Sequence, residues 1–244
     1  MRIVAIMLAA IIVASAAALA DPPPIRTLVF NFTFGTTSDL EVLNSGIDPT
    51  SQTPGGSGVS NFYGSEGDKG TINVDVLGER SDRSLVVKVS EQGQQRRRAG
   101  PAVCIVWATT AVSCDRDLTV LPEELAIVRL LAPGFVDPNK IDENNHWAIN
   151  VGNASNGAKM DFRIKSNDNG ILKIDSDSSS SAHSGGSATS TSSEKISYDM
   201  ADNVPTAIDE YTIARMPQAM GQYQVQKSEI TASLASDTLT KHTH

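Results

Sequence analysis

The stretch KMDFRIKSNDNGILKID, residues 159–175, decides the fold class. Apolar and polar residues alternate on both sides of Asn169-Gly170, and this period of two is the pattern of strands with one buried face. Asn-Gly between two such runs is the strongest short-range hairpin signal. The stretch therefore predicts two antiparallel strands whose apolar side chains share one face. These side chains are Met160, Phe162, Ile164, Leu172 and Ile174.

The same alternation recurs along most of the chain. Clear runs lie at 27–34, 71–77, 84–90, 146–151 and 195–200, and weaker runs lie at 207–216 and 222–231. Together with two short arms around the cysteines they make about eleven candidate strands. Short turns join most of them in order, which is typical of an antiparallel meander.

One segment, residues 122–132, has the pattern of a helix. Pro122 suits the first helical position, Glu123 and Glu124 suit the positive helix end, and Pro133-Gly134 stops the run. Leu125, Val128 and Leu131–Ala132 are expected to form the buried stripe. We predict a mainly β protein, in which an antiparallel meander of about ten strands forms a curved sheet or open half-barrel with one helix packed on its concave face. A β-sandwich is the alternative.

The N-terminus has the three parts of an export signal. Arg2 supplies the positive charge, residues 3–14 are apolar, and Ala18-Leu19-Ala20 is an A-x-A cleavage site. We expect residues 1–20 to be a signal peptide, which predicts an exported protein, periplasmic or extracellular, without an integral membrane segment after cleavage. A Pro-rich spacer at 21–25, a single β-rich domain at 26–234 with flexible insertions at 44–70 and 175–194, and a frayed tail at 235–244 complete the predicted organisation.

The two cysteines are predicted to form a structural disulfide. Cys104 and Cys114 flank a segment that folds about Thr109, which places the two residues opposite each other in an antiparallel pair. A redox or metal pair expects closer spacing or further Cys and His ligands. Disulfides are typical of exported proteins.

Charge restricts the partners. The formal net charge is −8, so nucleic acid is not expected as a partner, and the basic run Arg96–Arg98 is read as a solvated loop or a contact for an anionic partner. No motif for a cofactor is present, and the sequence favours a non-enzymatic role.

The functional hypothesis is a binding protein that holds an apolar small molecule or a lipid in a β cup. Curved sheets and half-barrels enclose such ligands with inward-facing apolar side chains. The alternative is a secreted or surface β-sandwich module that binds a protein partner. The candidate ligand-lining residues are Phe30, Phe32, Phe34, Trp147, Phe162 and Tyr198.

A polar cluster at 137–146 offers two weaker hypotheses. Asp137, Asp142 and Glu143 are weak candidates for a calcium site, but Asp142 stands where a calcium loop needs glycine, and a solvated loop is the preferred interpretation. His146 beside these acids is the centre of a less favoured hydrolase hypothesis. Ser192 and Lys195 match the S-x-x-K pattern at the edge of the second predicted insertion.

Overall fold

The structure is a computed structural model and describes residues 23–42, 61–95, 100–115, 120–153, 156–183, 187–218 and 222–239. The predicted signal peptide, residues 44–60 of the first predicted insertion and the basic run Arg96–Arg98 lie outside these ranges. Within the described ranges, no helix is both long enough and apolar enough to cross a membrane.

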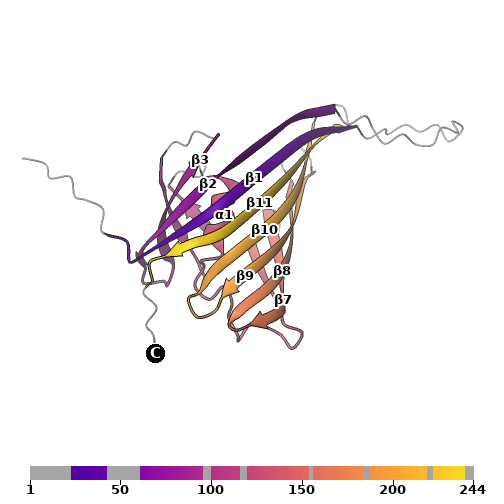
Figure 1. The fold of residues 1–244 in the computed structure, drawn as a ribbon. Coiled ribbons are helices and arrows are strands. Elements are labelled where there is room, and N and C mark those ends of the chain that lie inside the picture. The colour runs from indigo at the N-terminus through magenta and orange to yellow at the C-terminus, as the bar shows by residue number, and fades with distance from the viewer. Residues whose placement is uncertain are drawn as a thin grey trace, which may run out of the picture.

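The described chain forms one antiparallel sheet of 11 strands with α1 (Pro122–Arg129) against it (Figure 1). The order across the sheet is β5-β4-β3-β2-β1-β11-β10-β9-β8-β7-β6, so β5 and β6 are the two edges. The sheet is open, as predicted, and the β-sandwich alternative is wrong because all of these strands belong to one sheet. The strands are β1 (Arg26–Val42), β2 (Asn61–Glu79), β3 (Leu85–Gly93), β4 (Ala102–Val106), β5 (Val112–Cys114), β6 (His146–Asn153), β7 (Asn156–Asp168), β8 (Ile171–His183), β9 (Ser187–Asp199), β10 (Val204–Pro217) and β11 (Gln222–Asp237).

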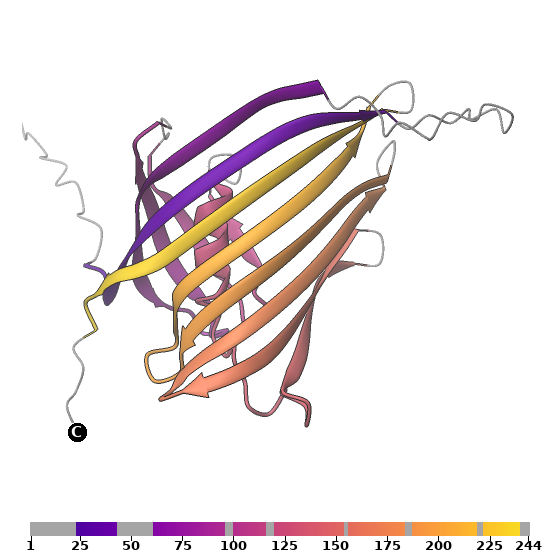
Figure 2. The ribbon, with the colours of Figure 1, turned by 45° about the vertical axis from the view of Figure 1, so that its right-hand side comes forward.

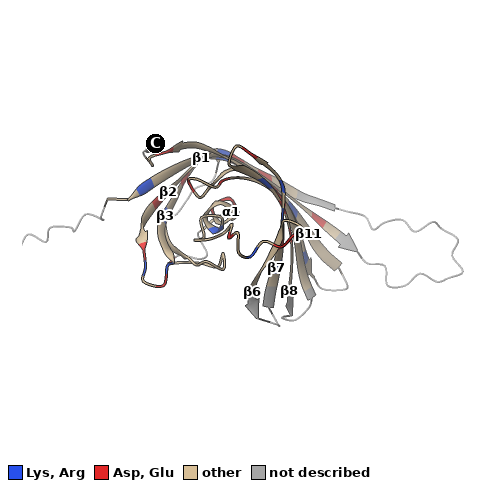
Figure 3. Ribbon diagram, turned by 90° about the horizontal axis from the view of Figure 1, so that it is seen from below, with Lys and Arg blue, Asp and Glu red and all other residues tan. Residues whose placement is uncertain are grey.

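Local sequence explains the turns and the curvature. Asn169 and Gly170 both have positive φ, at 54° and 87°, as the predicted Asn-Gly hairpin between β7 and β8 requires. Register shifts interrupt several strand pairs, among them one between Ile164 and Ser166 of β7 and one between Pro205 and Ala207 of β10. Such bulges bend a strand and increase its twist. The sheet accordingly curls around α1, which lies inside the arc when the molecule is viewed along the strands (Figure 3).

The predicted disulfide between Cys104 and Cys114 is confirmed. The two residues are direct partners of β4 and β5, with their Cα atoms 4.0 Å apart. Trp107 N–H donates to the carbonyl of Ala111 at 3.0 Å and closes the connecting turn around the predicted position. The disulfide thus ties the edge strand β5 to the sheet just before the chain leaves for α1.

The predicted loose insertions are wrong where the structure describes them. Residues 61–70 belong to β2, and residues 175–183 and 187–194 belong to β8 and β9. The serine-rich strands persist because backbone pairing needs no apolar side chain and because hydroxyls also pair across strands, as between Ser178 Oγ and Ser192 Oγ at 2.7 Å. The tail likewise remains in β11 as far as Asp237.

The helix begins as predicted, ends at Arg129 rather than at residue 132, and buries the predicted stripe except for Leu125. Leu121 N–H donates to the Glu124 carboxylate at 3.0 Å at its start. Leu125 is 37% exposed, while Glu123 and Glu124 are fully buried. Leu130, Leu131 and Phe135, which follow the helix, are all buried, and the orientation that buries them turns Leu125 to solvent.

Candidate functional site: the concave face and its plug

The concave face changes chemistry along the strands, as three successive rows of paired residues show. The apolar row consists of Ile164, Ile174, Ile196, Ile208, Ala232, Phe32 and Gly70. The boundary row consists of Trp147, Phe162, Ser176, Glu194, Glu210, Ile230, Phe34 and Asp68. The hydroxyl row consists of Met160, Ser178, Ser192, Thr212, Ser228, Thr36 and Glu66.

The predicted ligand-lining residues all lie on the concave face and all are buried. Phe30, Phe32, Phe34, Trp147, Phe162 and Tyr198 are between 0 and 6% exposed and belong to one hydrophobic core that includes residues of α1. Burial raises the pKa of Tyr198 well above the ordinary value of tyrosine, so its phenol stays neutral. The structure brings Trp147, Phe162 and Tyr198 together around one further ring.

That ring belongs to Phe135, which the sequence analysis did not single out. Its centroid lies 5.2 Å from that of Phe162, 5.3 Å from that of Tyr198 and 5.9 Å from that of Trp147. Gly134, with φ of 68°, turns the chain just before it, a conformation that glycine adopts at no steric cost. We call residues 120–136 the plug, because this segment fills the apolar part of the cup.

The plug is also joined to the boundary row by charge. The Arg129 guanidinium forms ion pairs with Glu194 of β9 and with Glu210 of β10, the latter at 3.2 Å. Glu194 and Glu210 are direct neighbours across the two strands and are 3% and 8% exposed. The Thr212 hydroxyl donates to Glu210 at 3.1 Å.

Two other polar atoms of the boundary row are buried without a hydrogen bond. Ser176 Oγ, on the strand next to Glu194, and Trp147 Nε1 have no partner, although their residues are only 2% and 4% exposed. Buried polar atoms are normally hydrogen-bonded, so each exception calls for an explanation. The row therefore offers one free hydroxyl and one free N–H beside a shared pair of carboxylates.

Beyond the boundary row the concave face is polar and solvent reaches it. Ser178, Ser192, Thr212, Ser228 and Thr36 are all partly exposed, whereas five of the seven residues of the apolar row are buried. The long strands continue well past α1 at this end of the sheet (Figure 2). The cup thus has a dry end, occupied by the plug, and a wet end lined by hydroxyl groups.

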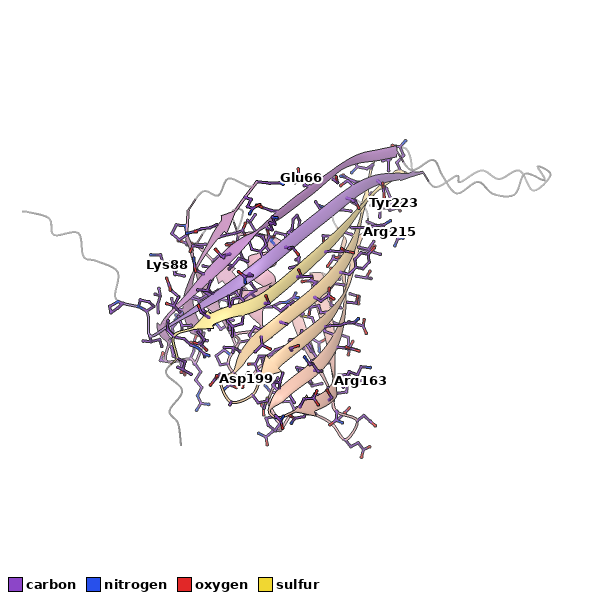
Figure 4. The ribbon with its side chains drawn as sticks, in the orientation of Figure 1. Glu66, Lys88, Arg163, Asp199, Arg215 and Tyr223 are labelled. Carbon is purple, nitrogen blue, oxygen red and sulfur yellow. A yellow bond between two sulfur atoms is a disulfide. The ribbon has the colours of Figure 1, made fainter. Side chains whose placement is uncertain are left out.

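His146 lies elsewhere, at the start of the edge strand β6. Its ring contacts Asp142 at 3.5 Å and Asp161 at 3.3 Å, beside a hollow of about 420 Å³ that Arg163 also lines. A hydrogen bond from Lys159 lowers the pKa of Asp161, and a backbone hydrogen bond from His146 lowers that of Asp142. Arg163 lies on β7, next to the edge strand β6, whereas Lys88 lies on β3, toward the other edge of the curved sheet (Figure 4).

The other sequence candidates are not brought together. Asp137 accepts hydrogen bonds from Asn139, which lower its pKa, and pairs with Lys140 at 3.6 Å. Among the described residues, no group of three or more His, Cys, Asp or Glu side chains is arranged to hold a metal ion. Ser192 and Lys195 are three apart in β9 and therefore point to opposite faces of the sheet.

No protein-family model matches the sequence, and no curated protein matches it. One solved structure with a similar course of the chain is lipovitellin, described for its lipid–protein interactions, at 8% sequence identity and a TM-score of 0.46. The match covers 88% of this chain and 26% of the lipovitellin chain, so this protein spans about a quarter of that chain's length.

Proposed function

We propose that this chain is an exported, non-enzymatic binding protein that holds an amphipathic ligand in the β cup. The observation that carries the proposal is the change along the concave face from a dry aromatic end to a wet hydroxyl-lined end. A ligand with an apolar part and a polar part matches both ends at once. The plug occupies the place that the apolar part would take.

The topology supports an exchange between plug and ligand. The plug lies in the connection between β5 and β6, which are the two edges of the sheet. Its departure from the cup therefore requires no strand pair to open. Arg129 links it to the sheet by ion pairs, and Phe135 links it by packing. These are side-chain contacts that a ligand can replace.

Export is the second part of the proposal. It rests on the signal pattern of residues 1–20 and is supported by the disulfide, because cytosolic conditions keep most thiols reduced. N-terminal sequencing of the protein recovered from a cell envelope or culture medium tests it. A mature chain that begins at Asp21 is expected, and a chain retained in the cytoplasm with Met1 intact contradicts export.

A fluorescence titration tests the binding function. Trp107→Phe leaves Trp147 as the sole tryptophan, stacked on Phe162 at 5.1 Å between ring centroids. The neutral apolar dye N-phenyl-1-naphthylamine is expected to bind saturably, near one per chain, and to quench Trp147. A dye signal that does not saturate, or that leaves Trp147 emission unchanged, contradicts binding in the cup.

Phe135→Ala separates exchange with the plug from simple cavity binding. Loss of the Phe135 ring weakens the internal competitor, so dye affinity is expected to rise in this variant. Phe30→Ala, which removes another buried ring of the concave face, is the matched control. Equal gains in the two variants contradict the exchange, because an apolar cavity alone also binds apolar molecules.

A further inference from the structure

We propose that the ligand of the cup is a cationic amphiphile, a long-chain amine whose ammonium group replaces the Arg129 guanidinium between Glu194 and Glu210. This inference rests on the proposed function and names the chemistry of its ligand. It follows from the charge that the plug brings into the cup and takes away when it leaves.

The first step is the position of the two carboxylates. Glu194 and Glu210 are direct partners on β9 and β10, and directly opposed side chains have Cβ atoms about 4.5–5.5 Å apart. Both are almost fully buried, and like charges in such a pair destabilise each other. Arg129 is paired with both carboxylates and compensates this repulsion.

The second step is the consequence of exchange. A ligand that takes the place of the plug removes Arg129 together with Phe135, because both belong to the same short segment. Glu194 and Glu210 then remain in the sheet without that cation. Breaking a buried ion pair by removing one partner is strongly unfavourable, since the remaining charge is left uncompensated. A neutral or anionic ligand binds against this unfavourable free energy, whereas a cationic ligand compensates the two carboxylates in place of Arg129.

The third step is the match of donors and acceptors. An ammonium group has three N–H donors and no acceptor. The boundary row offers the Glu194 carboxylate, the Glu210 carboxylate and Ser176 Oγ, which is 98% buried and has no hydrogen-bond partner. Ser176 is the direct neighbour of Glu194, so three acceptors lie on three adjacent strands in one row. A primary amine satisfies this set, with its chain in the aromatic end of the cup.

A comparison of three probes with the same chain tests the inference. Dodecylamine, dodecan-1-ol and dodecanoic acid are titrated, below their aggregation limits, into the Trp107→Phe protein, and Trp147 emission is recorded. The amine is expected to bind at least about tenfold more tightly than the other two, a difference of about 1.4 kcal/mol. Equal affinities for the three probes overturn the inference and leave the binding function standing, whereas no saturable binding of any probe overturns the binding function itself.

Isosteric variants locate the site. Glu210→Gln removes a partner of the amine and also an ion pair of the plug. The variant is therefore expected to raise alcohol affinity and to lower the ratio of amine to alcohol affinity about tenfold, equivalent to about 1.4 kcal/mol. Ser176→Ala provides a milder variant for the case in which Glu210→Gln folds poorly, with a smaller loss for the amine. Glu229→Gln is the matched control, because Glu229 lies on the next strand, is exposed and alternates with the concave-facing Ile230. A ratio of amine to alcohol affinity that is unchanged in Glu210→Gln and Ser176→Ala, or that falls as much in Glu229→Gln, overturns the assignment of the site.

Discussion

The two halves of strand β8 line the same cup and differ in chemistry. Leu172 and Ile174 are at most 4% exposed, whereas Ser178 and Ser180 on the same face are half-exposed. The pairing of β8 with β9 nevertheless runs without a register shift from Ile171 to His183. Backbone pairing therefore builds the whole sheet, and the side chains determine which part the plug covers.

The largest expected effect comes from breaking the dry half at the plug. Phe135→Ala removes a buried ring that contacts three aromatic side chains, and such truncations destabilise by about 3–5 kcal/mol. Chemical denaturation measures the loss. Leu125→Ala, on the exposed side of α1, is expected to stay within about 1 kcal/mol of the wild type. Similar losses in the two variants mean that the plug is not anchored by Phe135.

Two substitutions on β8 compare the dry half and the wet half of the concave face directly. Ile174→Ser removes a buried side chain and places a hydroxyl in an apolar site, which is expected to destabilise by about 3 kcal/mol or more. Ser178→Val, four residues farther along the same face, is expected to change stability by less than about 1 kcal/mol. Equal losses in urea denaturation contradict the division of the concave face.

The disulfide is expected to stabilise the edge of the dry half. Closing the short loop between Cys104 and Cys114 is expected to stabilise by a little under about 3 kcal/mol. The double variant Cys104→Ala/Cys114→Ala is compared with the reduced wild type by thermal denaturation. Both are expected to melt at a lower temperature than the oxidised protein. A reduced protein with the same melting temperature as the oxidised protein contradicts stabilisation by the disulfide.

The smallest effect lies on the polar surface at Asp161. Its pKa is lowered first by Lys159, so the stability it contributes is present above the ordinary aspartate pKa and is lost as the pH falls through the lowered pKa. Lys159→Ala is expected to raise the pKa of Asp161 in an NMR titration, with a stability change below about 1 kcal/mol. Lys165→Ala, whose lysine pairs with Asp175, is the control and should leave the pKa of Asp161 unchanged.

Much of the fold was predictable because strand signals are local. The alternation of Leu172 and Ile174, the Asn-Gly turn and the position of the cysteines each depend on residues close together in the chain. The serine-rich parts of β8 and β9 were not predictable from apolar content, because their pairing is supported by neighbouring strands rather than by a buried face of their own.

The site was predictable only in its apolar part. Phe162 and Tyr198 stand at inward positions of alternating runs, so their place on the concave face follows from period two. Continuing the same period from Tyr198 and Ile196 to Glu194 would have placed that glutamate inside as well. The pairing of Glu194 and Glu210 with Arg129 joins residues far apart in the chain, and no local pattern encodes it.

Hydrogen exchange of the plug amides tests the central claim most directly. The exchange of the backbone amides of the plug, residues 120–136 apart from its two prolines, is measured with and without saturating dodecylamine, beside that of β8 and β9. If the ligand replaces the plug in the cup, protection of the plug amides falls on binding, while the ladder amides of Ile174 and Ile196 stay protected. Bound amine with unchanged protection of the plug contradicts the exchange of plug and ligand.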